Sequence, residues 1–203
     1  MRAGFFLLLA SIVAAGIATL GYGTEGFRVI TSEGARRLAV ERAPKTVPNV
    51  SLIDQDGVSF SLDDYRGKVL LIEFIYTSCP TLCGVLGEDF RRVEDLILHD
   101  GGINQAVSLL SISFDTARNG PAELKSYGER FGAASPRWRI AVPTASGLQT
   151  LLRAFSVVII RDGWGGFVHN GAVCVVDRQG RLIQIVDAGL PERMLKQVMQ
   201  SAS

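Results

Sequence analysis

The chain has 203 residues, of which 47% are hydrophobic and 20% charged, a composition typical of one globular domain with short additions. Its formal net charge is +1 and it contains no lysine- or arginine-rich block, so a nucleic-acid partner has no electrostatic support. Three cysteines are too few for a disulfide scaffold in a domain of this size. Two of them, Cys79 and Cys83, lie close together, which indicates a redox or metal site.

A long apolar segment opens the chain. Residues 3–23 contain no charge, and Arg2 with the amino terminus places positive charge in front of them. About 20 apolar residues can span a bilayer, whereas the apolar core of a cleaved signal peptide usually has about 7 to 15. We therefore predict a signal anchor or transmembrane helix over residues 1–24, with a cleaved signal peptide as the alternative. Because such a segment is most often an export signal, we place the rest of the protein outside the cytoplasm.

Residues 25–45 are expected to form a tether, since charged residues, glycine and proline are mixed there and apolar residues do not recur at helix or strand spacing. A short helical piece around Ala35 to Val40 is the regular element expected within it. The folded domain is expected to span residues 46–203.

Apolar patterns of strand and helix type alternate through the domain. Strands are expected at residues 50–53, 58–62, 69–76, 106–114, 138–142, 157–160, 172–176 and 182–186. Helices are expected at residues 85–97, 121–131, 146–155 and 191–200. Turn sequences ending in glycine make the first and last strand pairs hairpins, and the glycine-rich residues 162–166 read as a loop. This order predicts an α/β fold of thioredoxin-like type, with three layers and a mixed central sheet.

The cysteine pair stands where the apolar strand 69–76 gives way to a helix. Open α/β sheets place their chemistry at this carboxyl end of a strand. The spacing puts both sulfurs on one face if the loop is helical, and the start of the following helix favours thiolates. Two thiolates suit Cu(I) or zinc, or they can close into a disulfide. A stabilising disulfide or two buried thiols are the structural alternative.

The chain has two histidines, His99 and His169. His99 lies at the predicted end of a helix, where an imidazole commonly caps the last backbone carbonyls by a hydrogen bond. His169 follows the glycine-rich loop and is expected to open the strand of the last hairpin, close to the cysteine loop. Two thiolates and an imidazole would hold Cu(I) and also accept Cu(II); an ordinary hydrogen-bonded loop histidine is the alternative. Cys174 lies within an apolar strand and is expected to be a buried core residue.

These features resemble the Sco/SenC family of membrane-anchored copper-binding proteins with a thioredoxin fold. The resemblance runs from about residue 44 to the end and is carried by residues 76–83, 111–115, 168–169 and 175–180. It implies that Cys79, Cys83 and His169 bind copper. It also implies a copper chaperone or thiol reductase that serves assembly of the dinuclear copper centre of cytochrome c oxidase. The implied partners are an oxidase subunit or other cuproprotein client and a copper donor protein, in the bacterial periplasm or the mitochondrial intermembrane space.

The chain departs from the family pattern at two positions beside the expected ligands. Gly84 follows the second cysteine where the family usually has proline, and Val168 precedes the histidine where the family has aspartate. A carboxylate that would orient the imidazole is therefore missing from that position. Asp115 is an alternative nearby acid. These changes remove no ligand, and they suggest a divergent branch whose client differs.

Two further functions share these residues. In a thiol-disulfide reductase, Cys79 would be the attacking thiol and Cys83 the resolving one. Against this, thioredoxins usually carry a proline facing the cysteines, and this chain has none between Pro143 and Pro191. A redox sensor or peroxide-consuming protein fits the fold, but the sequence offers no distinctive arginine or threonine constellation for it.

Overall fold

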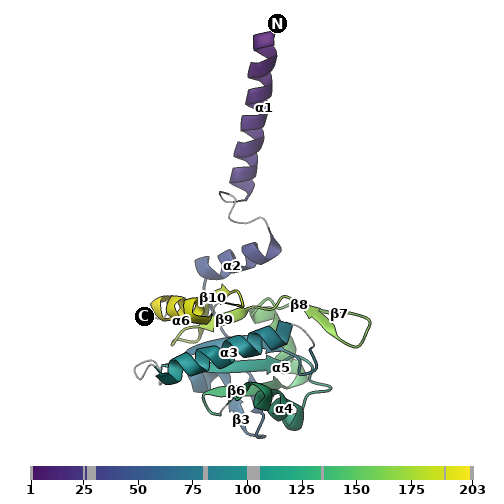
Figure 1. The fold of residues 1–203 in the computed structure, drawn as a ribbon, viewed down its shortest axis with the longest axis vertical. Coiled ribbons are helices and arrows are strands. Elements are labelled where there is room, and N and C mark those ends of the chain that lie inside the picture. The colour runs from purple at the N-terminus through teal and green to yellow at the C-terminus, as the bar shows by residue number, and fades with distance from the viewer. Residues whose placement is uncertain are drawn as a thin grey trace. The chain divides into compact units, whose positions relative to one another are not determined.

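The structure is a computed structural model that describes residues 2–24, 26, 31–79, 82–99, 106–133, 135–189 and 191–201. The chain divides into two compact units, residues 1–42 and residues 43–203. The first unit contains two helices, α1 (Arg2–Gly23) and α2 (Ser32–Arg42). The second contains the β-sheet and the helices that cover it (Figure 1).

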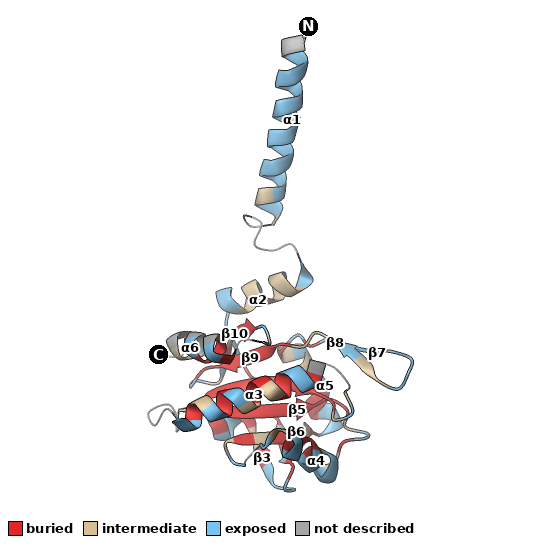
Figure 2. Ribbon diagram, in the orientation of Figure 1, coloured by how far each residue is buried: buried red, intermediate tan, exposed pale blue. Residues whose placement is uncertain are grey.

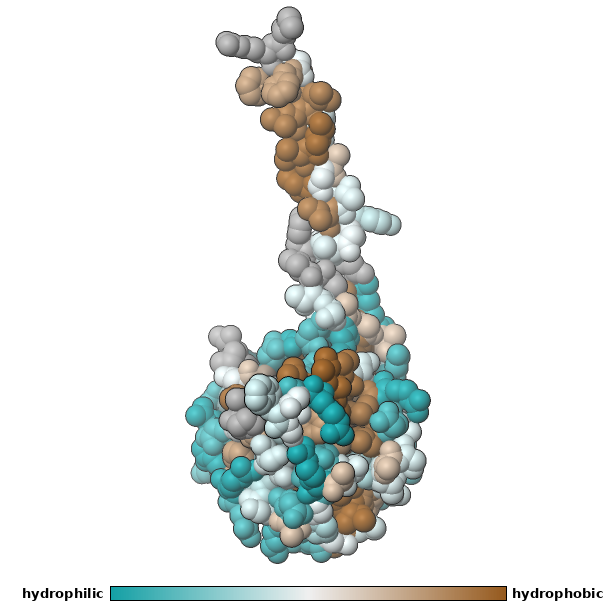
Figure 3. Space-filling view, turned by 90° about the vertical axis from the view of Figure 1, so that its right-hand side faces the viewer, coloured by the Kyte–Doolittle hydropathy of each residue, from teal (hydrophilic) through white to brown (hydrophobic). Residues whose placement is uncertain are grey.

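Helix α1 carries apolar side chains all along its length (Figure 3). Residues 4–23 are long and apolar enough to cross a membrane, by length and composition. Helix α2 occupies most of the segment for which only a short helical piece was expected. The hydroxyl of Thr31 accepts a hydrogen bond from the backbone N–H of Gly34, and Glu33 pairs with Arg36 and Arg37. Local polar contacts therefore define α2, which an apolar period would not reveal.

The central sheet has eight strands in the order β1-β10-β9-β4-β5-β6-β2-β3. Their bounds are β1 (Lys45–Thr46), β2 (Ser51–Asp54), β3 (Ser59–Ser61), β4 (Val69–Ile75), β5 (Val107–Ser113), β6 (Trp138–Pro143), β9 (Val173–Val176) and β10 (Arg181–Val186). Strands β4, β5 and β6 run parallel, and the other neighbours pair antiparallel. The expected mixed α/β sheet is confirmed, and β1 is an addition that the sequence pattern did not predict.

Helices cover both faces of the sheet. They are η1 (Leu62–Tyr65), α3 (Leu82–His99), α4 (Pro121–Phe131), α5 (Ala145–Ala154) and α6 (Pro191–Ser201). Helix α3 lies on one face with α6 and α4 beside it (Figure 1). On the opposite face Phe74 of β4 packs on Phe155, which follows α5, with ring centroids 5.3 Å apart. The domain therefore has three layers: α3, α4 and α6 on one face, the sheet in the middle, and α5 on the opposite face.

Strands β4 and β5 form the centre of the core. Every residue of both strands is buried, as expected for strands covered on both faces (Figure 2). On the α3 side, Trp138 packs edge-on against Phe90 at 5.6 Å and also contacts Phe131. This rigid centre holds the carboxyl ends of β4 and β5, where the cysteine loop begins.

The segment from residue 157 to residue 169 differs from the prediction. It forms a separate two-stranded hairpin, β7 (Ile159–Arg161) and β8 (Phe167–His169), outside the eight-stranded sheet. His169 therefore ends β8 instead of opening the strand of the last hairpin. The hairpin closes because the Asp162 carboxylate accepts hydrogen bonds from the backbone N–H groups of Trp164 and Gly166. Gly163 and Gly165 supply the positive φ angles of the tip, 78° and 92°.

Candidate functional site

The two cysteines lie at the carboxyl end of β4 and the start of α3. Cys79 follows a turn in which its N–H donates to the carbonyl of Tyr76 at 3.1 Å, and Cys83 lies in the first turn of α3. The N–H of Cys83 points at the sulfur of Cys79, 3.5 Å away. An N–H at a helix start favours a thiolate on that sulfur. All three cysteines of the chain are thiols in this structure.

The two sulfurs differ in their exposure to solvent. Cys83 is 1% exposed, whereas Cys79 is half-buried. Burial, followed by its hydrogen bond with Cys79, raises the pKa of the Cys83 thiol well above its usual range. The Cys83 carbonyl accepts a hydrogen bond from the hydroxyl of Tyr127 at 3.0 Å, which ties α3 to α4. Cys79 is thus the accessible sulfur, and Cys83 is the sulfur held by the core.

A second set of hydrogen bonds holds the loop in front of Cys79. The Asn119 side-chain oxygen accepts from the backbone N–H of Thr77 at 3.1 Å and from the hydroxyl of Ser113 at 2.6 Å. Arg130 of α4 donates to the carbonyl of Thr77 at 2.8 Å. Asn119 and Arg130 are positioning residues that the sequence did not reveal. The available signal was an asparagine a few residues after a buried strand.

His169 lies in an aromatic cluster at the same end of the sheet. Its ring centroid is 5.1 Å from that of Phe114 and 6.5 Å from that of Tyr76, and Phe167 contacts both of those rings. The residue is half-buried, but both imidazole nitrogens are shielded from solvent, and neither has a hydrogen-bond partner among the described residues. Burial lowers the pKa of His169, so the ring is neutral near pH 7, which is the form that binds metals.

Tyr76 links the histidine to the cysteines. Its ring contacts His169. Burial raises the pKa of its hydroxyl, and Cys79 raises that pKa further through a hydrogen bond and its charge. In the part of the chain that the structure describes, no three histidine, cysteine or acidic side chains stand close enough together to hold a metal ion. Cys79 and Cys83 are adjacent, and His169 lies one aromatic ring away; Pro80 and Thr81 lie outside the described residues.

The residue types at this site nevertheless fit a soft metal ion. Two thiols and a neutral imidazole are donors that copper accepts in both oxidation states. A buried imidazole with both nitrogens unsatisfied is costly unless something else binds it.

Three other residues singled out in the sequence have structural roles here. Cys174 is 1% exposed within β9, as predicted for a core residue. The Nδ1 of His99 lies 2.7 Å from the carbonyl of Asp95 at the end of α3, which confirms its place at the helix end. Asp115 pairs with Arg118 at 2.5 Å, and Arg118 donates to the carbonyl of Gly165 in the hairpin tip. Asp115 therefore secures the hairpin that carries His169.

Comparison with known proteins decides the family. The SCO1/SenC family model matches residues 39–202. The chain belongs to the SCO1/SenC family. A putative copper-binding protein of Stutzerimonas stutzeri is 24% identical over 165 residues, which are 77% of this chain and 78% of that protein.

Solved structures of Sco proteins share the fold. Bradyrhizobium japonicum ScoI with copper bound superposes with a TM-score of 0.65 at 23% identity, over 77% of this chain and 99% of that one. BsSco, described as a member of the Sco family of cytochrome c oxidase assembly proteins with a disulfide switch, gives a TM-score of 0.66 at 19% identity. That match covers 78% of this chain and 94% of BsSco. The predicted thioredoxin-like fold is confirmed.

This Sco chain also contains a buried acid beneath the cysteine helix. Glu73 of β4 is fully buried, and one of its oxygens accepts a hydrogen bond from the hydroxyl of Ser111 at 2.5 Å. The indole N–H of Trp138 donates to that hydroxyl at 2.9 Å, and the second oxygen of Glu73 has no hydrogen-bond partner among the described residues. Burial raises the pKa of Glu73 to about 8. The sequence signal was a single charged residue in an apolar strand.

Proposed function

We propose that this Sco chain is a copper chaperone that binds one copper ion through Cys79, Cys83 and His169. Its role is to support maturation of the dinuclear copper centre of cytochrome c oxidase. The observation that carries the proposal is the neutral imidazole of His169, one aromatic ring from a thiol pair. Its two nitrogens are buried and lack partners among the described residues. Membership of the family and the copper-binding relative support the choice of metal.

The three residues contribute differently to holding the copper ion. Cys79 is accessible and is the sulfur that first meets an incoming ion, while the buried Cys83 encloses it from the core side. The pKa of Cys83 is raised by burial, so copper binding at neutral pH must release the proton of that thiol. Affinity for copper is therefore expected to increase with pH. Neutral His169 completes the donor set without losing a proton.

Titration of the reduced full-length chain with Cu(I), in competition with a coloured Cu(I) chelator, tests the metal site. We expect one Cu(I) per chain and a loss of at least about 100-fold in affinity for Cys79→Ser and for Cys83→Ser, because a ligand matters at least as much as the groups that orient it. His169→Ala is expected to alter the visible spectrum of the Cu(II) form most. His99→Ala is the matched control for the histidine, and Cys174→Ala for the cysteines. Unchanged affinity in either serine variant would contradict the proposal.

A thiol-disulfide reductase is the second candidate. An accessible Cys79 next to a buried Cys83 is the arrangement of an attacking and a resolving thiol, and the related BsSco has a disulfide switch. The decisive assay uses a copper-free oxidase subunit whose two cysteines form a disulfide. Reduction of that disulfide by the copper-free chain, abolished by Cys79→Ser, would favour the reductase over the chaperone.

We also propose that residues 1–24 anchor the protein in a membrane, that residues 25–45 form the tether, and that the domain of residues 46–203 lies outside the cytoplasm. Helix α1 is long and apolar enough for a span. In this arrangement the copper donor protein and the client meet the domain at the membrane surface.

A further inference from the structure

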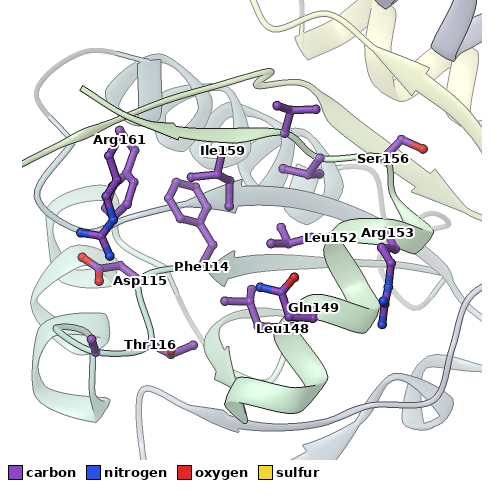
Figure 4. A pocket seen from close by; sticks show the side chains of 14 residues that line it. Phe114, Asp115, Thr116, Leu148, Gln149, Leu152, Arg153, Ser156, Ile159 and Arg161 are labelled. Atoms are coloured by element: carbon purple, nitrogen blue, oxygen red, sulfur yellow. The ribbon is translucent and has the colours of Figure 1, made fainter. Parts of the chain in front are cut away.

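A groove of about 630 Å³ lies beside His169, between α5, the loop after β5 and the β7–β8 hairpin (Figure 4). Its apolar lining includes Phe114, Leu148, Leu152, Ile159 and Phe167. These side chains come from three separate parts of the chain. A concave apolar surface of this size is suited to a large side chain of a ligand.

The charges around the groove are predominantly positive. Figure 4 shows Arg153 and Arg161 at opposite ends, with apolar side chains between them. Both arginines are exposed, and neither pairs with a carboxylate in the described part of the chain. Asp115 supplies the carboxylate among the described lining residues, and this carboxylate already forms an ion pair with Arg118. Two guanidinium groups are therefore available to a ligand that brings negative charge.

The groove shares its wall with the candidate copper site. Phe114 and Ile159 line the groove, yet the Phe114 ring packs on His169, and Ile159 is the residue opposite His169 in the hairpin. A ligand that displaces Phe114 or Ile159 would therefore also move the imidazole of His169, which lies directly behind them. Binding in the groove and the position of the imidazole are therefore physically coupled.

Apolar side chains are also exposed at the rim of the groove and on the other face of the hairpin. Val158 lines the groove and is 57% exposed; Ile160 and Val168, opposite each other across the strands, are 60% and 62% exposed, and Trp164 at the tip is 94% exposed. The face that carries this hairpin is turned to the viewer in Figure 3, where brown patches interrupt the teal surface. Exposed apolar side chains gathered on one hairpin of a folded domain indicate an interaction site.

We propose that this groove docks an acidic–apolar segment of the client protein, in which a large apolar side chain is flanked by carboxylates. The apolar side chain would fill the space above Phe114 and Leu152, and the carboxylates would pair with Arg153 and Arg161. The identity of the partner as the client rests on the proposed function; binding in the groove itself needs no copper. Docking there places the client's copper-site cysteines next to the hairpin that carries His169.

A labelled peptide tests the groove directly. The full-length, copper-free chain in nanodiscs of zwitterionic lipid is titrated into a fluorescein-labelled peptide, Asp-Glu-Leu-Phe-Glu-Asp, and anisotropy is recorded. We expect saturable binding that the double variant Arg153→Glu/Arg161→Glu weakens by about 10-fold or more, and that salt also weakens. Arg178→Glu is the matched control. It changes an exposed arginine after β9, beside the end of β4 opposite the cysteine loop, and should leave the affinity unchanged.

Two comparison peptides and one spectroscopic measurement complete the test. A peptide with lysine in place of the acids and one with serine in place of Leu-Phe should both bind at least about 10-fold more weakly. In a His99→Ala chain with labelled histidine, the acidic peptide should shift the ring signals of His169. Equal binding of the lysine peptide, an unchanged affinity in the double variant, or an unmoved His169 signal would each overturn the proposal.

The remaining outcomes separate the possible occupants. If the chain self-associates and the double variant abolishes this, the groove binds a second copy and client docking is overturned. Binding to anionic vesicles that depends on the two arginines, without peptide binding, would also overturn client docking and assign the groove to a membrane surface. The double variant should still bind one Cu(I). If the wild-type chain fails to bind copper while the peptide shows the expected dependence on both arginines, the docking groove stands and the copper function fails.

Discussion

His169 and Glu73 both have buried polar atoms without hydrogen-bond partners among the described residues, but they lie in different surroundings. The His169 ring lies in the β7–β8 hairpin, outside the eight-stranded sheet, and its two buried nitrogens are surrounded by the Tyr76 and Phe114 rings. Glu73 lies in the core, where Ser111 of β5 donates to one of its oxygens and the nearby carboxyl of Asp89 in α3 further disfavours its charge. Protonation is therefore the way in which Glu73 avoids a buried charge.

Glu73→Gln is expected to make the stability of the protein less dependent on pH. Burial raises the pKa of Glu73 from 4.5 to about 8, so its contribution to stability is complete below pH 4.5 and is lost as pH rises through 8. The loss is on the order of 1.4 kcal/mol per pH unit across that interval, a few kcal/mol in total. The variant should equal the wild type near pH 5 and exceed it at pH 8.5 in free energy of unfolding, measured with urea.

Glu88→Gln provides the control for this comparison. Glu88 is half-buried on α3, and its hydrogen bond with Arg91 lowers its pKa to about 2, so its titration in the folded protein lies below the tested interval. This variant should keep the wild-type slope between pH 5 and pH 8.5. An identical slope in Glu73→Gln would show that Glu73 is ionised at pH 5 or is not linked to folding.

At the scale of elements, the close approach of α3 and α4 positions the cysteine helix. A Cβ on Gly87 of α3 would lie 2.7 Å from ring atoms of Phe131 in α4, so only glycine allows this distance between the helices. The same packing brings the Tyr127 hydroxyl to the carbonyl of Cys83. The geometry of the first turn of α3 thus depends on a contact several residues further along the helix.

Gly87→Ala is expected to destabilise the protein by about 1 to 3 kcal/mol, because the ring of Phe131 must move to admit the methyl group. Gly84→Ala in the same helix is the control, since a Cβ there meets nothing within 4 Å. That variant should be neutral or more stable by up to about 1 kcal/mol, because alanine is the better helix former. Urea unfolding at pH 7 measures both, and equal effects at the two positions would refute the packing argument.

At the scale of the whole molecule, α1 is the candidate membrane anchor of the folded domain. We expect the full-length chain, expressed in a bacterium, to remain in the membrane pellet after a carbonate wash and to retain residues 1–24 by intact mass. Deletion of residues 1–24 should release a soluble chain. The physical reason is the length and apolar composition of residues 4–23.

Protease added to spheroplasts tests the predicted orientation. Digestion of the domain in intact spheroplasts is the expected result, because the domain should face outward. Protection until the membrane is dissolved would place it in the cytoplasm. A mature chain that lacks the apolar segment would instead identify that segment as a cleaved signal peptide.

Sequence patterns predicted most of the fold because its elements are defined by burial. Strands β4 and β5 are buried on both faces and read as continuous apolar runs, and α3 and α5 carry apolar residues at helical spacing. The elements that the patterns missed have other causes. Helix α2 depends on capping and ion pairs, and the hairpin of β7 and β8 depends on an aspartate turn with two positive-φ glycines.

The amino-acid sequence by itself determined the family, the apolar N-terminal segment and the cysteine pair at the end of β4, because each is recognised from residues that are close together in the chain. Tertiary structure decided what surrounds those cysteines. It placed His169 against Tyr76 and Phe114, buried Glu73 beneath α3 and formed the arginine-flanked groove beside the histidine. These properties depend on residues far apart in the chain, whose burial and charge interactions exist only once the sheet has brought them together.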